Sequence, residues 1–230
     1  MLETYGHVTQ LINEFGIESV ISTLLPFMTD ERMVKIDSIL QQRIGSIHVA
    51  VESPYDIHNA YAIVRSAEAM GVNNVHIISS ELKKSRGKKT AGGTNRWMNV
   101  FKYRELDPFI SMMEQGNIAL AGASPKGTVQ LSEIPVDKPI CLVFGNEHRG
   151  LTDQLLDQCD IQYQIPMFGM AESLNLSVSA GISLYDIVRR KRHSMKGQGD
   201  LTESEKELEK AKYLIRSLGV KFSTAVLNKD

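Results

Sequence analysis

The chain has 230 residues, of which 42 % are hydrophobic and 23 % are charged, which suits one moderate domain or one domain with appendages and allows a large core. Its net charge of −1 excludes a strongly basic nucleic-acid binder, and any such binding must come from local patches. The two cysteines have no C-x-x-C spacing and predict buried free thiols in a reducing compartment. The sequence has no apolar run near the roughly 20 residues of a membrane-spanning helix and no signal-peptide pattern. We therefore expect a soluble cytoplasmic protein.

Apolar residues at helical spacing predict a helical N-terminal extension over residues 1–45. Three stripes carry the pattern, and the third follows a start signal at Thr29-Asp30. The stripes are Val8, Leu11, Ile12 and Phe15; Val20, Ile21, Leu24 and Leu25; and Met33, Ile36, Ile39 and Leu40. Such a short extension buries little apolar area alone. We expect it to pack on the main domain, on a partner subunit or on a bound macromolecule.

From residue 46 the pattern changes to short apolar runs that alternate with helical stretches. The predicted strands are 47–51, 75–79, 118–123, 140–144 and 161–165, and the predicted helices are 57–70, 105–115 and 151–158. This alternation predicts an α/β domain with a parallel sheet over residues 46–193. Ligands of such sheets bind beyond the carboxyl ends of the strands, here at the turns after Val51, Ala123, Phe144 and Ile165.

Residues 194–230 predict a C-terminal helical extension. Thr202 and Glu205 form a capping box that opens a charged helix. The apolar stripe of this helix comprises Leu208, Ala211, Leu214 and Leu218.

The segment 165–192 leaves a strand, turns at Pro166 and Gly169 and enters a helix. Ser173 and Asn175 stand where side-chain oxygens can cap backbone N–H groups. The predicted buried face of the helix comprises Val178, Ile182, Tyr185 and Val188. A capped core helix explains these features without any further function.

Other features of the same segment indicate more than a core helix. Gly181 lies inside the predicted buried face and suggests close packing on another backbone. The loop before the helix is dense in Met, Ser and Asn, and the helix ends with four consecutive cations at residues 189–192. A helix C-terminus tolerates cations, but four in a row exceed what its dipole needs.

Asn59 and Arg65 belong to a predicted helix and are six residues apart, which is not the spacing of one helix face. Asn59 can be a helix cap, and Arg65 can be a solvated side chain. In the functional interpretation, Asn59 acts from the helix start, while Arg65 makes a bidentate phosphate contact that lysine cannot copy. The residues alone leave both interpretations open.

A basic segment precedes two glycines, Arg96 and Trp97, the only tryptophan. Its cations are Lys83, Lys84, Arg86, Lys88 and Lys89. A solvated loop would account for this charge. Phosphate contacts together with a stacking indole ring would instead suit RNA.

The turn 144–151 follows a buried strand and places Gly145 and Gly150 at the spacing of a P-loop. Leu151 occupies the position of the essential lysine, so the P-loop interpretation fails. The glycines still allow a small ligand to approach the backbone closely. The six histidines show no metal-ligand spacing, and we predict no metal site.

Together these segments resemble the SpoU/TrmH family of SPOUT RNA ribose 2′-O-methyltransferases, over about residues 46–192. Three motifs carry the resemblance. They are Asn59, Arg65, Ser66 and Gly71-Val72; Leu142 to Glu147 with Gly150-Leu151; and Ile165-Pro166-Met167 with Gly169 and Ser173 to Ser179. The second and third motifs are highly specific in combination.

The resemblance implies a parallel-sheet methyltransferase domain with a C-terminal deep trefoil knot formed by the second and third motifs, although knots are otherwise essentially absent from proteins. It also implies a homodimer and the cofactor S-adenosylmethionine. By analogy, the cofactor-binding residues are Gly122, Ala123, Gly145, Ile165, Met167 and Leu174. The apolar side chains of Met167 and Leu174 suit the face of an adenine.

The family assigns removal of the ribose 2′-hydroxyl proton to the first-motif arginine, here Arg65, assisted by a substrate phosphate. Arginine is normally protonated too strongly to act as a base, so proton abstraction is a hypothesis. The alternative is that Arg65 positions the phosphate and the hydroxyl in line with the methyl donor. The resemblance gives Asn59, Glu147, Ser173 and Asn175 the role of orienting Arg65 and the ribose.

Helical extensions at both ends and basic patches at 83–89 and 189–192 favour the tRNA-modifying branch, which methylates a guanosine ribose in the D-loop. The predicted RNA-binding residues are Lys83, Lys84, Arg86, Lys88, Lys89, Arg189, Arg190 and Arg192. A ribosomal-RNA methyltransferase of the same family is the first alternative, but such members more often carry a separate N-terminal domain. A non-catalytic RNA-binding module is the second, and the intact motif set argues against it. A nucleotide hydrolase is disfavoured by Leu151.

Overall fold

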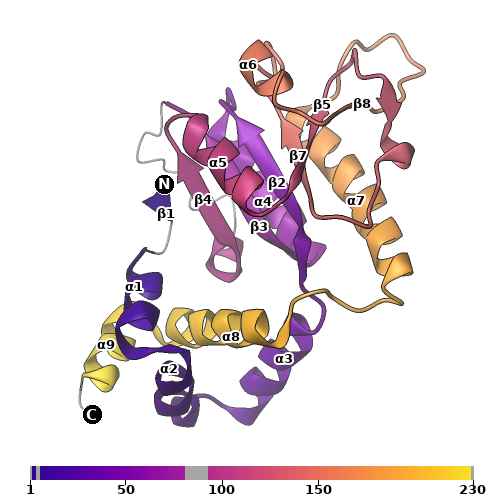
Figure 1. Cartoon of the computed structure of the whole chain (residues 1–230). Helices are drawn as coiled ribbons and strands as arrows, with labels where there is room; N and C mark the ends of the chain where they lie inside the picture. Colours follow the sequence, from indigo (N-terminus) through magenta and orange to yellow (C-terminus); the bar gives the residue numbers. More distant parts are fainter. Residues whose placement is uncertain (1, 4–5, 81–92, 229–230) are drawn as a thin grey trace.

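The computed structural model of the chain describes residues 2–3, 6–80 and 93–228. Figure 1 shows a twisted sheet with helices on both faces, and a separate group of helices at one end that contains both the first and the last helices of the chain. Within the described residues, every helix is too short or too polar to span a lipid bilayer.

The described chain forms one sheet with the strand order β1-β4-β3-β2-β7-β5-β8-β6. The strands are β1 (Leu2–Glu3), β2 (Ile44–Glu52), β3 (Val72–Ile78), β4 (Asn99–Tyr103), β5 (Ala119–Ala123), β6 (Val129–Gln130), β7 (Ile140–Phe144) and β8 (Ile161–Gln164). All described neighbours pair in parallel except β1, which is antiparallel to β4. The predicted α/β parallel sheet is therefore confirmed, while β1, β4 and β6 had no counterpart among the predicted strands.

Two helical layers cover the sheet, as its near-continuously apolar central strands require. One layer contains α4 (Ile57–Ala69) and α7 (Leu176–Ser194), whose apolar side chains share a core with β2, β3 and β7. The other contains α5 (Asp107–Gln115) and α6 (Asp153–Leu156), which pack on the opposite face. All five residues of β7 are buried between the layers.

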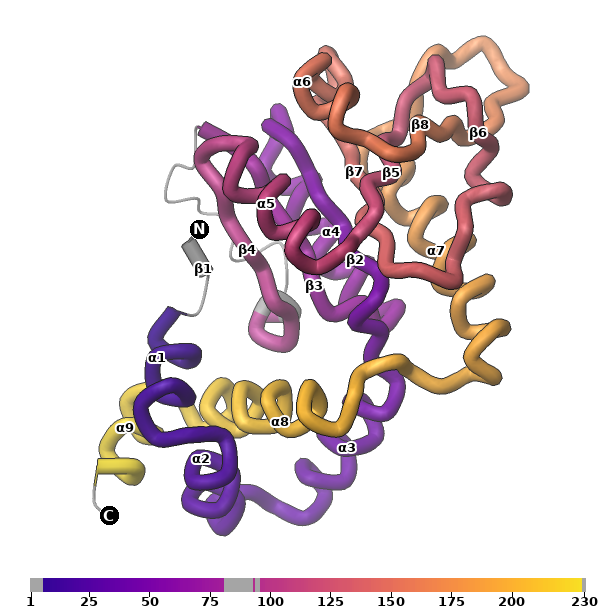
Figure 2. Tube along the Cα trace, viewed as in Figure 1, coloured from indigo at the N-terminus to yellow at the C-terminus, as the bar shows by residue number. Residues whose placement is uncertain are grey.

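The helices from the two ends of the chain pack together (Figures 1 and 2). They are α1 (Gly6–Phe15), α2 (Ile17–Leu24), the 3₁₀ turn η1 (Leu25–Phe27), α3 (Asp30–Leu40), α8 (Glu203–Leu218) and α9 (Val220–Leu227). We call this group the terminal layer. Thr29 caps α3, and the predicted capping box of Thr202 and Glu205 opens α8. The division of the chain at residues 45 and 193 stays a prediction.

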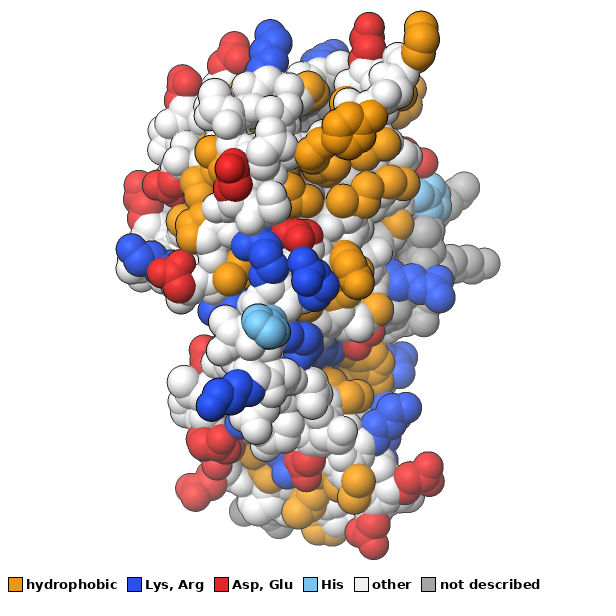
Figure 3. All heavy atoms as spheres, turned by 90° about the vertical axis from the view of Figure 1, so that its right-hand side faces the viewer, with side chains coloured by type: hydrophobic (Ala, Val, Ile, Leu, Met, Phe, Trp, Pro, Cys, Tyr) orange, Lys and Arg blue, Asp and Glu red, His pale blue; other side chains and the backbone are white. Residues whose placement is uncertain are grey.

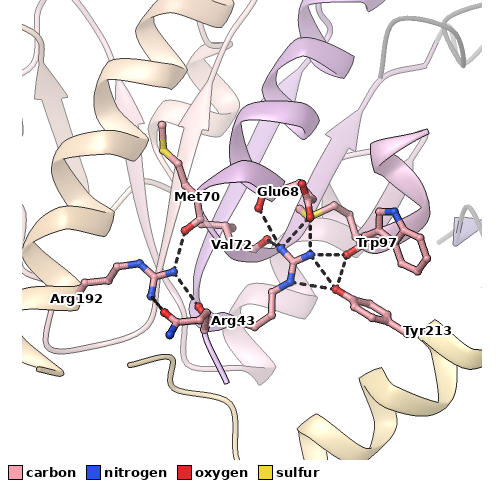
Figure 4. Close-up of polar contacts among 9 residues, drawn as sticks. Arg43, Glu68, Met70, Val72, Trp97, Arg192 and Tyr213 are labelled. Carbon is pink, nitrogen blue, oxygen red and sulfur yellow. Dashed lines mark hydrogen bonds and ion pairs between the residues drawn. The ribbon is translucent and has the colours of Figure 1, made fainter. Parts of the chain in front are cut away.

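A buried arginine joins the terminal layer to the sheet (Figure 4). Arg43 is 1 % exposed and donates to the Tyr213 hydroxyl of α8 at 3.0 Å from Nε and 2.8 Å from Nη2. It also donates to Glu68 Oε1 at 2.9 Å, to the Val72 carbonyl at 3.2 Å and to the Trp97 carbonyl at 3.0 Å. One guanidinium therefore connects α8, α4, β3 and the 3₁₀ turn η3 (Thr94–Trp97).

A second arginine connects the carboxyl ends of α4 and α7 (Figure 4). Arg192 donates from Nη2 to the carbonyl of Met70, the residue after α4, at 3.0 Å and to the carbonyl of Gln42 at 2.8 Å. The next residue, Gly71, has a φ of 86°, and a Cβ there would lie 2.5 Å from Arg192 Nη2. The absence of a side chain at Gly71 thus allows the guanidinium to reach the last carbonyls of α4.

The predicted buried face of α7 is wrong for most of its residues. Val178, Ile182 and Tyr185 are 48 %, 40 % and 63 % exposed, and only Val188 is buried. The face that contacts the sheet comprises Leu176, Ala180, Ser183, Leu184, Ile187 and Lys191 as well. Both faces carry apolar residues at helical spacing, so periodicity could not decide between them. Gly181 has nothing within 4 Å of a Cβ position, so it makes no close backbone contact with the described chain.

Candidate active site

A cavity of about 380 Å³ lies beyond the carboxyl ends of three neighbouring strands. Its walls come from the loops after β5, β7 and β8 and from the first turn of α7. This is the edge at which a parallel sheet binds its ligands, and the turns predicted from the sequence at Ala123, Phe144 and Ile165 all contribute to it.

The loop after β7 forms one wall through a tight backbone turn. Asn146 and Gly150 exchange two backbone hydrogen bonds, of 2.9 Å and 2.8 Å. A Cβ at Gly145 would lie 2.1 Å from the carbonyl carbon of Gly150, so this position accepts only glycine without movement of the turn. Gly150 has a φ of 72°, which favours glycine again. The two glycines thus shape the turn that bounds the cavity.

The same turn is fastened to the loop that leads from β2 into α4. Asn146 Nδ2 donates to the carbonyl of Ser53 at 2.7 Å. The buried carboxylate of Glu52 accepts from the backbone N–H of Thr152 at 2.8 Å and from its hydroxyl at 2.7 Å. These bonds hold the end of β2 and the residue after it against both ends of the second-motif turn. Glu52 and Thr152 were not identified from the sequence, where only their positions beside the motifs could have indicated them.

Glu147 connects the second-motif turn to the loop before α4 and to the start of that helix. Its Oε1 accepts from Asn59 Nδ2 at 2.8 Å, and its Oε2 accepts from the backbone N–H of Tyr55 at 2.7 Å. Partial burial acts to raise the pKa of Glu147, but these hydrogen bonds outweigh it and hold the pKa below its ordinary value. The structure therefore brings two predicted site residues, Asn59 and Glu147, together around an ionised carboxylate.

The third motif contributes Ser173 and Asn175 in different ways. Asn175 caps α7, because its Oδ1 accepts from the backbone N–H of Ser177 at 2.9 Å and from the Ser177 hydroxyl at 2.6 Å. The predicted capping role of Asn175 is thus confirmed. Ser173 is exposed and lines the cavity, whereas Asn175 does not line it.

The predicted cofactor residues mostly surround the cavity. Ala123, Gly145, Ile165, Met167 and Leu174 line it. Gly122 does not line the cavity; it is buried in β5, and a Cβ there would lie 2.8 Å from Cys159 Sγ. Its lack of a side chain allows close packing of Leu151 and Cys159, which lie before and after α6. Ser124, His148, Arg149 and Glu172 also line the cavity, and only their places next to the motifs could have indicated them in the sequence.

Arg65 lies apart from these residues. It is exposed on α4, does not line the cavity, and forms no hydrogen bond or ion pair with the described part of the chain. The structure thus unites Asn59 with Glu147 but leaves the Arg65 guanidinium available to another molecule.

Among the predicted RNA-binding residues of α7, Arg190 and Arg192 are engaged within the chain. Arg190 bonds to Asp186 at 2.7 Å and to the carbonyls of Ile134 and Leu131 at 2.6 Å and 2.9 Å. Arg192 holds the end of α4, as described above. Arg189 is 61 % exposed, with Asp186 3.6 Å away. The structure therefore explains two of these arginines without RNA and leaves Arg189 exposed.

The other basic prediction, at Lys83, Lys84, Arg86, Lys88 and Lys89, lies outside the described residues. Trp97, the other part of the predicted RNA contact, is half-buried and packs on side chains of the chain itself. The Arg32 guanidinium carbon is 4.9 Å from the centre of its ring, and the Tyr213 ring meets it edge-on at 5.2 Å. Contacts with α3 and α8 thus explain the presence of the tryptophan without an RNA contact.

The fold and the cavity define an α/β protein with a cavity of small-ligand size at the carboxyl edge of a parallel sheet. The sequence pattern of the SpoU rRNA Methylase family matches residues 46–185 of the chain. The chain belongs to this family, and the resemblance drawn from the three motifs is confirmed.

Curated relatives and solved structures agree with this assignment. The chain is 31 % identical to the tRNA (guanosine(18)-2′-O)-methyltransferase of Escherichia coli K12 over 168 residues, which cover 73 % of each chain. It is 31 % identical to the enzyme of the same name from Aquifex aeolicus over 179 residues, covering 76 % of this chain and 85 % of the relative. The crystal structure of the A. aeolicus TrmH/SpoU tRNA modifying enzyme superposes with a TM-score of 0.74 at 27 % identity and covers 83 % of this chain and 98 % of its own.

An AdoMet-bound rRNA methyltransferase from Sinorhizobium meliloti is a more distant structural neighbour. Its TM-score is 0.59 at 25 % identity, with 65 % of this chain and 58 % of the neighbour covered.

Proposed function

We propose that this chain transfers a methyl group from S-adenosylmethionine to the 2′-hydroxyl of a guanosine ribose in the tRNA D-loop. The observation that carries the proposal is the Asn59–Glu147 pair at the rim of a cavity built by the second and third motifs. Relatives that cover about three quarters of the chain carry this activity in their names.

The residues around the cavity fit S-adenosylmethionine. The cavity of about 380 Å³ falls within the range of small-molecule sites. Ile165, Leu174 and Met167 offer apolar surface for an adenine, and the nearby backbone at Gly145 can approach a ligand closely. When bound, the cofactor supplies an electrophilic methyl group on a sulfonium. We infer that Arg149 and Glu172, also in the lining, face its charged amino-acid end.

Glu147 and Asn59 would orient the ribose. Glu147 remains ionised at neutral pH and commits the Nδ2 of Asn59 to a hydrogen bond. The Oδ1 of Asn59 is then the part of the amide that can accept from a ribose hydroxyl. Ser173 from the third motif adds a hydroxyl to the lining of the same cavity. Asn175 would act by fixing the start of α7, because its side chain caps that helix.

Arg65 would bind the phosphate of the target nucleotide. Its exposed guanidinium forms no bond to the described chain, and a planar fork suits a phosphate. This contact places the 2′-hydroxyl for attack, which is worth a large rate factor through orientation alone. The alternative hypothesis, that Arg65 also takes the hydroxyl proton, requires a deprotonated guanidine. Arginine is almost always protonated, so we prefer the positioning role.

We also propose that the chain acts as a homodimer. Val178, Ile182 and Tyr185 form an exposed apolar face on α7. Phe168 and Met170, in the loop before α7, are almost wholly exposed as well. Figure 3 shows hydrophobic side chains gathered on this side of the molecule, above a group of Lys and Arg side chains. Contiguous apolar surface of this kind is typical of an interface, and a second copy of the chain is the occupant.

The deep trefoil knot is a further part of the proposal. In the sheet, β8 lies beyond β5, whereas the helix that follows β8 packs against α4 and β7. The chain therefore returns from the β8 side of the sheet to the β7 side, where the knot of the second and third motifs would form. Pulling the two ends of the protein apart tests the knot, because a tightened knot leaves the unfolded chain measurably shorter than its full contour length. A full-length extension would contradict it.

Methyl transfer from labelled S-adenosylmethionine to separate pools of unmodified tRNA and ribosomal RNA tests the activity. We expect label in tRNA, resistance of the modified ribose to alkaline cleavage, and loss of label with Arg65→Ala. Label only in ribosomal RNA would keep the chemistry and change the substrate. A folded wild-type protein that binds no cofactor in a calorimeter would instead support the non-catalytic RNA-binding module. Because tRNA is the expected substrate, we place the protein in the cytoplasm.

A further inference from the structure

An exposed aromatic ring lies next to the candidate active site. Tyr55 is 75 % exposed. Its ring meets the ring of His148 nearly at right angles, with an interplanar angle of 82° and 4.9 Å between the ring centroids. His148 itself lines the cavity, next to Glu147. The average tyrosine side chain is more buried than this one, so an exposed ring in a fixed position suggests a binding role.

The backbone of Tyr55 is fixed even though its ring is exposed. Its N–H donates to Glu147 Oε2 at 2.7 Å, and Oε1 of the same carboxylate accepts from Asn59 at 2.8 Å. One carboxylate thus positions both the backbone that carries the ring and the amide that we assign to the ribose. A ring and a ribose-binding group with a common anchor are suited to one and the same nucleotide.

We propose that Tyr55 stacks on the base of the nucleotide whose ribose is methylated, and that His148 holds the tyrosine ring in the required orientation. The proposal rests on the proposed function and names a residue that binds its substrate. Proteins that act on RNA loops receive unstacked bases on aromatic side chains. A nucleotide that turns toward the cavity loses its stacked neighbours, and the Tyr55 ring replaces one of them.

The chemistry of stacking limits what Tyr55 contributes. Every base presents a π-face, so a single aromatic platform adds affinity with little preference for one base. Tyr55 therefore binds the target nucleotide, and the choice of guanosine must come from groups that read the edge of the base. The exposed guanidinium of Arg65 supplies positive charge for the phosphate of the same nucleotide.

A binding cycle between protein and RNA tests the proposal. The affinity of the wild-type protein and of Tyr55→Leu is measured for a tRNA transcript and for the same transcript without a base at the D-loop guanosine. We expect removal of the base and removal of the ring each to weaken binding about 10-fold. Because both changes delete the same contact, we expect them together to weaken binding by about 10-fold as well, and not about 100-fold.

Three variants and readouts keep the result specific. Tyr55→Phe retains the ring and should bind within about 2-fold of the wild type; an affinity as low as that of Tyr55→Leu would overturn the proposal. Phe222→Leu removes a different exposed aromatic, 41 % exposed on α9, and should leave the ratio between intact and base-free tRNA unchanged. Tyr55→Leu should keep the oligomeric state of the wild type, since a change would assign the ring to a subunit interface instead.

Failure of this inference is distinct from failure of the proposed function. Independent effects of ring and base, in a wild-type protein that methylates the intact tRNA, refute the stacking role and leave the function intact. Equal wild-type affinity for the intact and base-free transcripts would likewise refute the stacking role and leave the function intact. A wild-type protein that transfers no methyl group to any RNA refutes the function itself.

Discussion

At the scale of single residues, the site depends on one carboxylate that holds two loops together. In Glu147→Gln, the amide nitrogen replaces one of two oxygens that accept hydrogen bonds from Tyr55 and Asn59. We expect the single-turnover rate of methyl transfer to fall about 100-fold, a typical contribution of one well-placed polar group. Cofactor affinity measured by calorimetry should change by less than about 2-fold, because Glu147 acts on the ribose side.

The control for this prediction is Glu207→Gln, which neutralises an exposed carboxylate on α8. It should leave both quantities at their wild-type values. A Glu147→Gln variant with a normal rate would show that the carboxylate only joins the loops.

Two histidines on the sheet make the stability of the protein depend on pH. His48 Nδ1 lies 2.9 Å from His76 Nε2, and His76 Nδ1 lies 3.1 Å from the Tyr103 hydroxyl. Burial lowers the pKa of His48 to about 4, an effect opposed by the Gly45 backbone and by Asp200. Burial and the neighbouring His48 also lower the pKa of His76. Both rings are therefore neutral in the folded protein.

The pH at which this matters follows from the direction of the shift. Unfolded histidine binds a proton below about pH 6.5, whereas His48 binds it only near pH 4. The unfolded state therefore gains protons first, and stability decreases as the pH falls from about 6.5 toward 4. We expect His48 to account for a loss on the order of 3 kcal/mol in the free energy of unfolding, measured by urea denaturation.

His48→Gln should reduce this pH dependence, and His193→Gln, a change at an exposed histidine of α7, should not. An equal slope in His48→Gln and the wild type would contradict the assignment.

At the scale of elements, Arg43 determines how the terminal layer meets the helix that carries Asn59 and Arg65. Arg43→Met leaves the Glu68 carboxylate and the Tyr213 hydroxyl without their shared donor. We expect a loss of about 3 kcal/mol in the free energy of unfolding. Arg43→Lys keeps the charge but not the planar fork, and should still cost about 2 kcal/mol.

Arg189→Lys provides the comparison, because Arg189 is exposed and its ion pair with Asp186 has a long N–O distance of 3.6 Å. Chemical denaturation should place this variant within about 0.5 kcal/mol of the wild type. A similarly mild effect of Arg43→Met would show that the terminal layer does not depend on this arginine.

The same scale shows which elements the sequence could predict. Strand β7 was predicted to the residue, because its five apolar side chains are buried on both faces. Strand β4 was missed, since it carries polar residues that are satisfied only in the fold. Asn99, for example, donates to Glu209 and accepts from Lys212, more than a hundred residues later in α8. No local pattern contains that information.

The site residues could also be predicted only where a local motif identified them. The motifs placed Asn59, Glu147 and Ser173 in one region because each lies at the carboxyl edge of the sheet. Charge alone did not reveal which arginines of 189–192 are exposed. Arg190 and Arg192 find carbonyl acceptors on η4 (Leu131–Glu133) and its neighbour and at the end of α4, contacts that only the tertiary structure provides.

At the scale of the whole molecule, the apolar face of α7 predicts the assembly. Ile182→Asp places a charge on a side chain that is 40 % exposed in the single chain, so the fold should tolerate it. In a dimer the same charge would be buried against apolar surface, which is strongly unfavourable. We expect a dimer for the wild type and a monomer for Ile182→Asp in light scattering after gel filtration.

Val34→Asp places the same charge on α3, at a side chain that is 69 % exposed, and should leave the dimer intact. A wild-type monomer, or a dimer that survives Ile182→Asp, would reject this face as the interface.

The terminal layer also determines when the protein can finish folding during synthesis. Helices α1 and α2 bury Val8, Leu11 and Val20 against α8 and α9, so their partners are synthesised only after every strand of the sheet. Arg43 likewise finds the Tyr213 hydroxyl 170 residues further along the chain. Until α8 has been synthesised, the nascent chain therefore carries exposed apolar helices and an arginine without its partner in α8. Closure of this layer has to wait for α8 and α9, and chaperones can bind the exposed helices throughout that interval.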